Sequence, residues 1–232
     1  MSKKQWLIVG GNSGIGAAIV ERLLARDDEV WCLSRHVEQY SGAVHTQQWN
    51  VLEQDFPVAF LPEKLDGLIY CPGSIRLKPF TQIRLEEFQE DLALNTFGAI
   101  KALQSCHSAL SKADHASVLL FSTVAVQTGL KFHASVATAK GALEGLVRSL
   151  AAEWAPRIHV NAIAPALIET PLSQPLIRDA KRRQSIEQMN PMKRIGQPDS
   201  IASLCEWLLM MPTPFVTGQV FAVDGGMSSV RV

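Results

Sequence analysis

A glycine-rich turn near the start of the chain constrains its fold more than any other stretch. An apolar run at residues 6–9 precedes the turn and apolar residues at helical spacing follow it, so the context is strand, tight turn and helix. Gly10 lets the chain turn, Gly14 lets a phosphate approach the backbone, and Gly16 lets the helix pack on the strand. Because the first amide groups of a helix carry partial positive charge, we expect this turn to hold a diphosphate rather than to be a turn without a ligand. The predicted binding residues here are Gly10, Asn12, Ser13, Gly14, Ile15 and Gly16.

Strand-like and helical patterns alternate along the rest of the chain. The apolar runs lie at residues 6–10, 29–34, 47–49, 67–71, 118–122, 158–163 and 219–223. Helical patterns fill most of the gaps, but two prolines in residues 51–66 leave room there for one or two helical turns at most. This alternation predicts an α/β fold, one Rossmann-type doubly wound domain over residues 1–232, with a seven-stranded parallel sheet and helices on both faces.

The balance of charges argues against several classes of partner. The 232 residues include 22 basic and 22 acidic side chains, so nothing favours nucleic acid or an anionic membrane. No apolar run reaches the ~20 residues of a membrane-spanning helix, and residues 1–4 lead into a strand without the apolar core of a signal peptide. We therefore expect a cytoplasmic protein. Its four cysteines occur singly, which predicts buried, reduced thiols and no metal site.

Ser34 and Arg35, at the end of the second predicted strand, bear on the choice of nucleotide. In an open parallel sheet the ligand binds beyond the carboxyl ends of the strands, and Ser34 and Arg35 lie where a dinucleotide would place its adenosine ribose. A carboxylate there would accept hydrogen bonds from a free 2′-hydroxyl, whereas hydroxyl and guanidinium groups suit a 2′-phosphate. The pair favours NADP over NAD, with a solvated surface arginine as the alternative.

Several motifs in a fixed order resemble the short-chain dehydrogenase/reductase family over nearly the whole chain. The glycine turn matches the family's cofactor turn, Asn95 matches its structural and catalytic asparagine, and Thr123 stands at the position of its catalytic serine. Gly73 is retained from the family's Asn-Asn-Ala-Gly stretch. Further similar segments are residues 160–165 with Thr170, residues 194–198 and residues 217–226.

The resemblance also implies roles for the remaining site residues. Lys140 would bond to the nicotinamide ribose, while Asn95 and Thr123 would complete the active-site network. The further expected cofactor contacts are Asn50, Val51, Cys71, Pro72, Gly73, Pro165, Ile168 and Thr170.

One position departs from the family's pattern. Family members carry a tyrosine four residues before the catalytic lysine, whereas this chain has Val136 before Lys140. One helical turn puts both positions on the same face, but valine can neither donate nor accept a proton. His133 precedes Lys140 by seven residues, a spacing similar to the tyrosine-to-lysine interval of divergent enoyl reductases in the same superfamily. We hypothesise that His133 protonates the nascent oxyanion, and slow turnover through a bound water is the alternative.

Residues 166–195 resemble the family segment that closes over the substrate. The segment contains a basic run at residues 181–183, which would suit an acidic ligand or would form a solvated helix face. A long apolar helical pattern at residues 80–97 has more apolar surface than one sheet face needs, which predicts subunit contacts in a homodimer or homotetramer.

The sequence therefore predicts an NADP-dependent oxidoreductase that acts on a carbonyl, alcohol or activated double bond of a small molecule. Its alternative is a non-catalytic NADP(H)-binding sensor or assembly subunit, favoured by Val136 and opposed by the retention of Lys140, Asn95 and Thr123. Oxidation of NADPH by a carbonyl compound or enone would favour the enzyme over the sensor.

Overall fold

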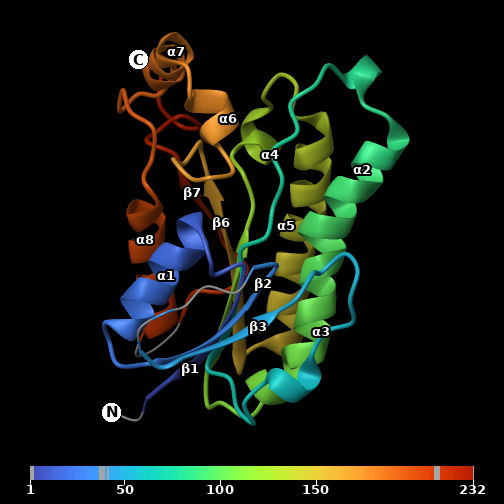
Figure 1. The fold of residues 1–232 in the computed structure, drawn as a ribbon, viewed down its shortest axis with the longest axis vertical. Helices are drawn as coiled ribbons and strands as arrows, with labels where there is room; N and C mark the ends of the chain where they lie inside the picture. The colour runs from blue at the N-terminus through green and yellow to red at the C-terminus, as the bar shows by residue number, and fades with distance from the viewer. Residues whose placement is uncertain (1–2, 37–39, 41, 212–214, 232) are drawn as a thin grey trace.

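Seven parallel strands form one twisted sheet in the order β3-β2-β1-β4-β5-β6-β7 (Figure 1). The computed structural model describes residues 3–36, 40, 42–211 and 215–231. The strands are β1 (Gln5–Val9), β2 (Glu29–Ser34), β3 (Val44–Gln48), β4 (Gly67–Tyr70), β5 (Ala116–Phe121), β6 (Ile158–Pro165) and β7 (Val220–Val223). The predicted α/β fold with a seven-stranded parallel sheet is confirmed.

The boundaries predicted for the third strand were wrong. β3 covers Val44–Gln48 rather than residues 47–49, and it pairs with β2 from Val44 to Gln48. It is an edge strand, and none of its five residues is fully buried. An edge strand needs no continuous apolar run, so its polar side chains concealed it from a search for such runs.

Helices cover both faces of the sheet, as Figure 1 shows. On one face lie α1 (Gly14–Leu24) and α8 (Pro198–Met210), and on the other lie α2 (Leu85–Leu92), α3 (Gly98–Leu110) and α5 (Ala134–Trp154). The buried apolar side chains form one cluster on each face: Leu7 and Val9 of β1 belong to one, Trp6 and Ile8 to the other. Burial on both faces explains the near-continuous apolar runs of the inner strands.

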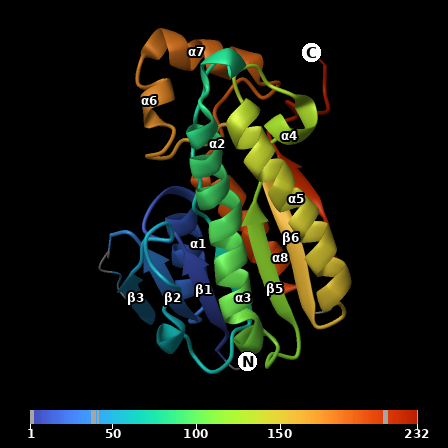
Figure 2. The same cartoon turned by 90° about the vertical axis from the view of Figure 1, so that its right-hand side faces the viewer.

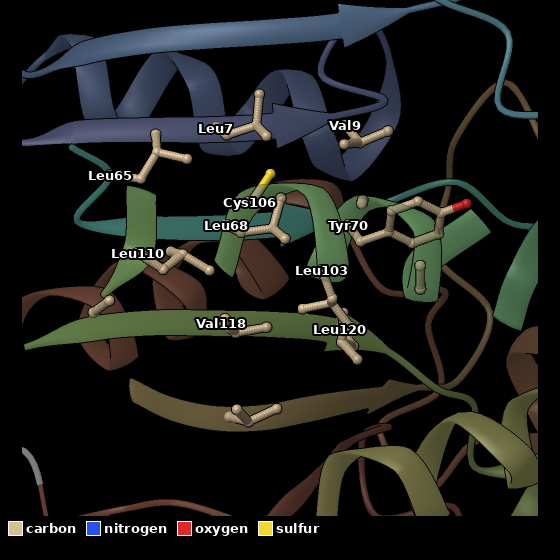
Figure 3. Packing of buried hydrophobic residues seen from close by; sticks show 14 of the residues in the cluster. Leu7, Val9, Leu65, Leu68, Tyr70, Leu103, Cys106, Leu110, Val118 and Leu120 are labelled. Carbon is tan, nitrogen blue, oxygen red and sulfur yellow. The ribbon is translucent and has the colours of Figure 1, made fainter. Parts of the chain in front are cut away.

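Figure 3 shows the cluster between the sheet and α3. Leu68 and Tyr70 of β4 pack near Leu103 and Cys106 of α3, and each of these side chains is at most 2% exposed. The Tyr70 hydroxyl donates a hydrogen bond to the Leu94 carbonyl at 2.6 Å. Burial raises the pKa of the Tyr70 phenol, so this tyrosine is a neutral core group.

The connection between β3 and β4 contains a single short helical turn, η1 (Val58–Phe60). This matches the short crossover that the two prolines predicted. A second such turn, η2 (Phe80–Gln82), precedes α2. No helix within the described residues is long and apolar enough to cross a membrane.

Three short helices lie beyond the carboxyl ends of the strands. α6 (Gln174–Ile177) and α7 (Ala180–Met189) belong to the segment 166–195, and α4 (Ala125–Thr128) follows β5. Figures 1 and 2 show α6 and α7 above this end of the sheet. The strand order reverses between β1 and β4, so this edge is where a doubly wound sheet binds its ligand.

Candidate functional site

A cavity of about 200 Å³ surrounds the glycine turn between β1 and α1. Gly10 has φ of +78° and Gly14 has φ of +55°, a region that favours glycine. At Gly16, a Cβ would collide with the carbonyl oxygen of Gly10, so the helix approaches the turn as closely as a glycine permits. Strand, turn and helix thus have the predicted arrangement, with the first amides of α1 at the cavity.

Most of the predicted nucleotide contacts line this cavity. They are Gly10, Asn12, Ser13, Gly14, Ile15, Gly16, Ser34, Arg35, Val51, Cys71, Pro72, Gly73 and Thr170. Asn50 does not line it: its side chain accepts a hydrogen bond from the Leu52 amide at 3.2 Å, while its neighbours Trp49 and Val51 face the cavity. Arg35 is exposed, and its guanidinium has no ion pair with any described residue.

Tyr40, which the sequence analysis missed, lies over the glycine turn. Its hydroxyl donates a hydrogen bond to the carbonyl of Gly11 at 2.5 Å. The contact joins the β2–β3 connection to the turn across 29 residues of sequence, and no motif in the chain predicted it.

A second cavity, of about 420 Å³, adjoins the first. The two share Ile15, Cys71, Gly73, Thr170 and Leu172. Of the predicted site residues, Thr123, His133, Lys140, Pro165 and Ile168 line the second cavity only. Burial raises the pKa of the Cys71 thiol, which therefore remains protonated on the floor between the cavities.

Lys140 extends from α5 to the junction of the two cavities. The residue is only 6% exposed, and burial lowers the pKa of its ammonium to about 8. Its Nζ lies 3.6 Å from the point that a Cβ on Gly73 would occupy, and Asn95 Oδ1 lies 3.3 Å from the same point. Within the described residues, neither atom has a hydrogen-bond partner. A buried acceptor and a buried cation beside Gly73, which has no side chain to fill the space between them, fit a ligand with hydroxyl groups, such as a ribose.

Asn95 lies on a π-helical turn, η3 (Ala93–Phe97), that joins α2 to α3. Its amide nitrogen donates hydrogen bonds to the Asp91 carbonyl at 2.8 Å and to Ser74 Oγ at 2.9 Å. The buried Asp91 carboxylate accepts hydrogen bonds from Ser74 at 2.7 Å and Ser135 at 2.5 Å. These partners fix the amide so that Oδ1 points toward Gly73 and Lys140. The sequence analysis missed Ser74, Asp91 and Ser135.

Two adjacent hydroxyls at the end of β5 face different surroundings. Ser122 Oγ donates a hydrogen bond to the buried carboxylate of Glu144 at 2.6 Å. Thr123 lines the larger cavity, and its Oγ1 accepts a hydrogen bond from the Ala125 amide at 3.3 Å. Because that oxygen acts as acceptor toward the backbone, its own proton can point to a ligand in the cavity.

His133 and Val136 face the same cavity from the start of α5. His133 Nδ1 lies 2.7 Å from the carbonyl oxygen of Lys131, so Nδ1 carries the proton and donates it there. This leaves Nε2 as the nitrogen that can exchange a proton with a ligand. Neither tyrosine of the chain lines this cavity, since Tyr40 lies over the glycine turn and Tyr70 in the core.

One wall of the larger cavity is an extended strap, residues 73–78, and from Ile75 to Lys78 its side chains alternate in direction. Ile75 and Leu77 line the cavity. Arg76 and Lys78 instead form ion pairs with Glu87 of α2, at 3.1 and 2.5 Å. The hydrogen bond from Lys78 holds the pKa of Glu87 at about 2, well below its ordinary value, so the pairs persist at neutral pH.

Comparisons with known proteins identify the family. A profile described as "Enoyl-(Acyl carrier protein) reductase" matches residues 50–228. A tropinone reductase homologue of Arabidopsis thaliana is 31% identical over 242 residues, which cover 96% of this chain and 89% of that protein. A second such homologue is 30% identical over 247 residues, 98% of this chain and 93% of that protein. The chain therefore belongs to the short-chain dehydrogenase/reductase family, as its motifs predicted.

Solved structures share the fold across the whole chain. The ligand-free aldohexose dehydrogenase of Thermoplasma acidophilum has a TM-score of 0.91 and 25% identity, over 99% of this chain and 97% of that one. A variant of ElxO with NADPH bound has a TM-score of 0.90 and 25% identity, over 99% of this chain and all of that one.

Proposed function

We propose that this protein is an NADP-dependent oxidoreductase that reduces or oxidises a carbonyl, alcohol or activated double bond of a small molecule. The observation that carries the proposal is a pair of polar atoms, Lys140 Nζ and Asn95 Oδ1, that lie beside Gly73, a residue shared by the two cavities, with no hydrogen-bond partner among the described residues. A buried ammonium without a partner is costly in a folded protein, and a ribose hydroxyl would relieve that cost. The glycine turn would hold the diphosphate beside it.

NADP is favoured over NAD by the residues at the end of β2. Ser34 and Arg35 line the smaller cavity, and neither is a carboxylate that would repel a 2′-phosphate. The exposed guanidinium of Arg35 is available for a bidentate contact with such a phosphate. The likeness to an NADPH-bound structure supports the same choice.

The chemistry divides between the nucleotide and the chain. NADPH, when bound, supplies the hydride. Lys140 would hold the nucleotide's ribose, and the Thr123 hydroxyl would donate a hydrogen bond to the substrate oxygen on which negative charge develops. Segment 166–195 would close over the substrate and exclude water. The start of this segment, directly after Pro165, lines the cavity.

The proton would come from His133 rather than from a tyrosine. Val136 occupies the turn before Lys140, where the family carries its phenol, and it lines the cavity with an apolar side chain. His133 lines the same cavity just before α5 begins, and its Nε2 is the nitrogen available for proton transfer because Nδ1 is committed to the Lys131 carbonyl. A bound water is the alternative donor.

A second function is favoured by one observation, the apolar Val136 at the reaction centre. A protein that binds NADP(H) without turnover, as a sensor or an assembly subunit, would keep the nucleotide residues and have no need of an acid. We also infer a homodimer or homotetramer, because Phe80 of η2, Leu85 of α2 and Phe97 of η3 are each more than half exposed.

A titration followed by a turnover assay tests the proposal. NADPH and NADH are titrated by calorimetry, and NADPH absorbance is then followed with a panel of ketones, aldehydes and enones. Tight NADPH binding with oxidation by some of these compounds is expected. Binding without oxidation by any of them would favour the sensor, and binding of neither nucleotide would refute both functions.

A further inference from the structure

The basic run on α7 divides into three different environments. Arg183 forms ion pairs with Glu169 and Glu187, at 2.5 and 3.1 Å. Lys181 is exposed and lines neither of the two cavities. Arg182, between them, lines the 420 Å³ cavity, and its guanidinium forms no ion pair with the residues that the structure describes. Arg182 is exposed like Lys181 but also lines the cavity, so a solvated helix face does not describe the whole run.

A second arginine lines the same cavity from the segment that follows α7. Arg194 precedes Ile195 and Gly196, and its side chain is exposed and also without an ion pair in the described part of the chain. The backbone next to it is fixed, since the Gly196 amide donates to the Leu167 carbonyl at 3.2 Å and the Glu169 backbone amide donates to the Gly196 carbonyl at 2.9 Å. Its position at the cavity rim is thus set by the fold, while its head group is free to bind.

The charges around the larger cavity have one sign. The basic residues that line this cavity are His133, Lys140, Arg182 and Arg194. Among the described residues, no aspartate or glutamate lines the cavity. Most of the remaining wall is apolar, including Ile75 and Leu77 of the strap. Basic groups at an apolar cavity with no acidic neighbour to neutralise them favour a ligand with a negative charge.

The phosphates of a dinucleotide do not explain these two arginines. The glycine turn and Arg35 line the smaller cavity, whereas Arg182 and Arg194 line only the larger one. The two cavities meet at Cys71 and Gly73, beside Lys140, so the arginines lie on the substrate's part of the joint space.

We propose that Arg182 and Arg194 bind an anionic group on an otherwise apolar substrate. The group would be a carboxylate, or a phosphate-type anion of the same charge, and the apolar body would lie against the strap. The inference rests on the proposed function, because it assigns the larger cavity to the substrate. Within the part of the chain that the structure describes, neither guanidinium forms an ion pair, so both are available to a ligand.

Calorimetry with small probes tests the proposal on the protein with saturating NADP and, in parallel, on the protein without added nucleotide. The probes are 4-phenylbutyrate and its uncharged isostere 4-phenylbutanamide, with 3-phenylpropylphosphonate to distinguish a phosphate-type anion from a carboxylate. We expect an acid to bind about tenfold more tightly than the amide, the order expected for one charge-assisted hydrogen bond. That preference should weaken as salt is added.

Variants assign the effect to the two arginines. The double substitution Arg182→Gln with Arg194→Gln should remove the preference for the acid and leave amide binding unchanged, and Lys181→Gln is the matched control that should retain it. Equal affinity for acid and amide, no binding of either acid, or an equal loss in Lys181→Gln would overturn the proposal. NADPH affinity is measured in parallel: weaker NADPH binding in the double variant would assign the arginines to the nucleotide instead. If the wild type bound no NADPH yet preferred the acid through these arginines, the anion site would stand and the oxidoreductase would not.

Discussion

Replacement of Lys140 by methionine should strengthen the fold and weaken nucleotide binding at the same time. The ammonium is buried and has no hydrogen-bond partner among the described residues, and burial lowers its pKa from 10.5 to about 8. This difference corresponds to about 3 kcal/mol of lost solvation in the folded state. Methionine keeps the length and the apolar contacts of the lysine stem. We therefore expect the free energy of unfolding at neutral pH to increase by about 1 to 3 kcal/mol in Lys140→Met.

The pH dependence of stability separates this cause from a change in packing. Because the pKa of Lys140 is lower in the folded than in the unfolded chain, unfolding takes up a proton between about pH 8 and pH 10.5, and stability should increase with pH across that window. Lys140→Met should lack this increase. Urea unfolding followed by tryptophan fluorescence, at several pH values across the window, measures both effects.

The same substitution should have the opposite effect on nucleotide binding, which it should weaken. Loss of the charge-assisted hydrogen bond to the ribose should weaken NADPH binding by about 10- to 100-fold. The matched control is Lys181→Met, an exposed lysine that lines neither cavity and should change neither quantity. A less stable Lys140→Met protein, or one with unchanged NADPH affinity, would refute the reasoning.

Four further substitutions test other parts of the site. Val136→Tyr returns a phenol to the turn before Lys140 and should raise turnover by about 10²-fold, measured by NADPH oxidation; an unchanged rate would mean that proton supply does not limit it. His133→Ala should lower turnover by about 10²-fold, and turnover unchanged across pH would remove His133 from the mechanism. Arg35→Gln should reduce the ratio of NADP to NAD affinity by about tenfold, and an unaltered ratio in calorimetry would contradict the assignment of the 2′-phosphate. Gly16→Ala would force a methyl group against the Gly10 carbonyl and should lower the free energy of unfolding by about 3 kcal/mol in urea titrations, a result that a fully stable variant would exclude.

The sequence predicted the elements whose residues are constrained locally. Inner strands must be apolar on both faces, and a tight turn against a helix needs glycine at Gly10 and Gly16, so both left clear signals. The edge strand β3 is polar because one side of it faces solvent, and its limits were missed for that reason.

Contacts between distant segments left no such signal. Tyr40 reaches Gly11 across a loop, and Asp91 is joined to Ser135 across 44 residues. Asn95 was predicted from a resemblance, but the π-helical turn that aims its amide was not, because helical periodicity changes little over a single inserted residue. The residues that touch a ligand were thus easier to predict than those that orient them.

In the strap of residues 73–78, the residues that hold the strap in place differ from those that shape the cavity. Arg76 and Lys78 anchor it to α2, and Ile75 and Leu77 form its inner surface. Exchange of the inner pair for larger, smaller or polar residues would reshape the chamber without loosening the anchor. A change of substrate specificity, in evolution or by protein design, could therefore begin with substitutions at these two positions alone.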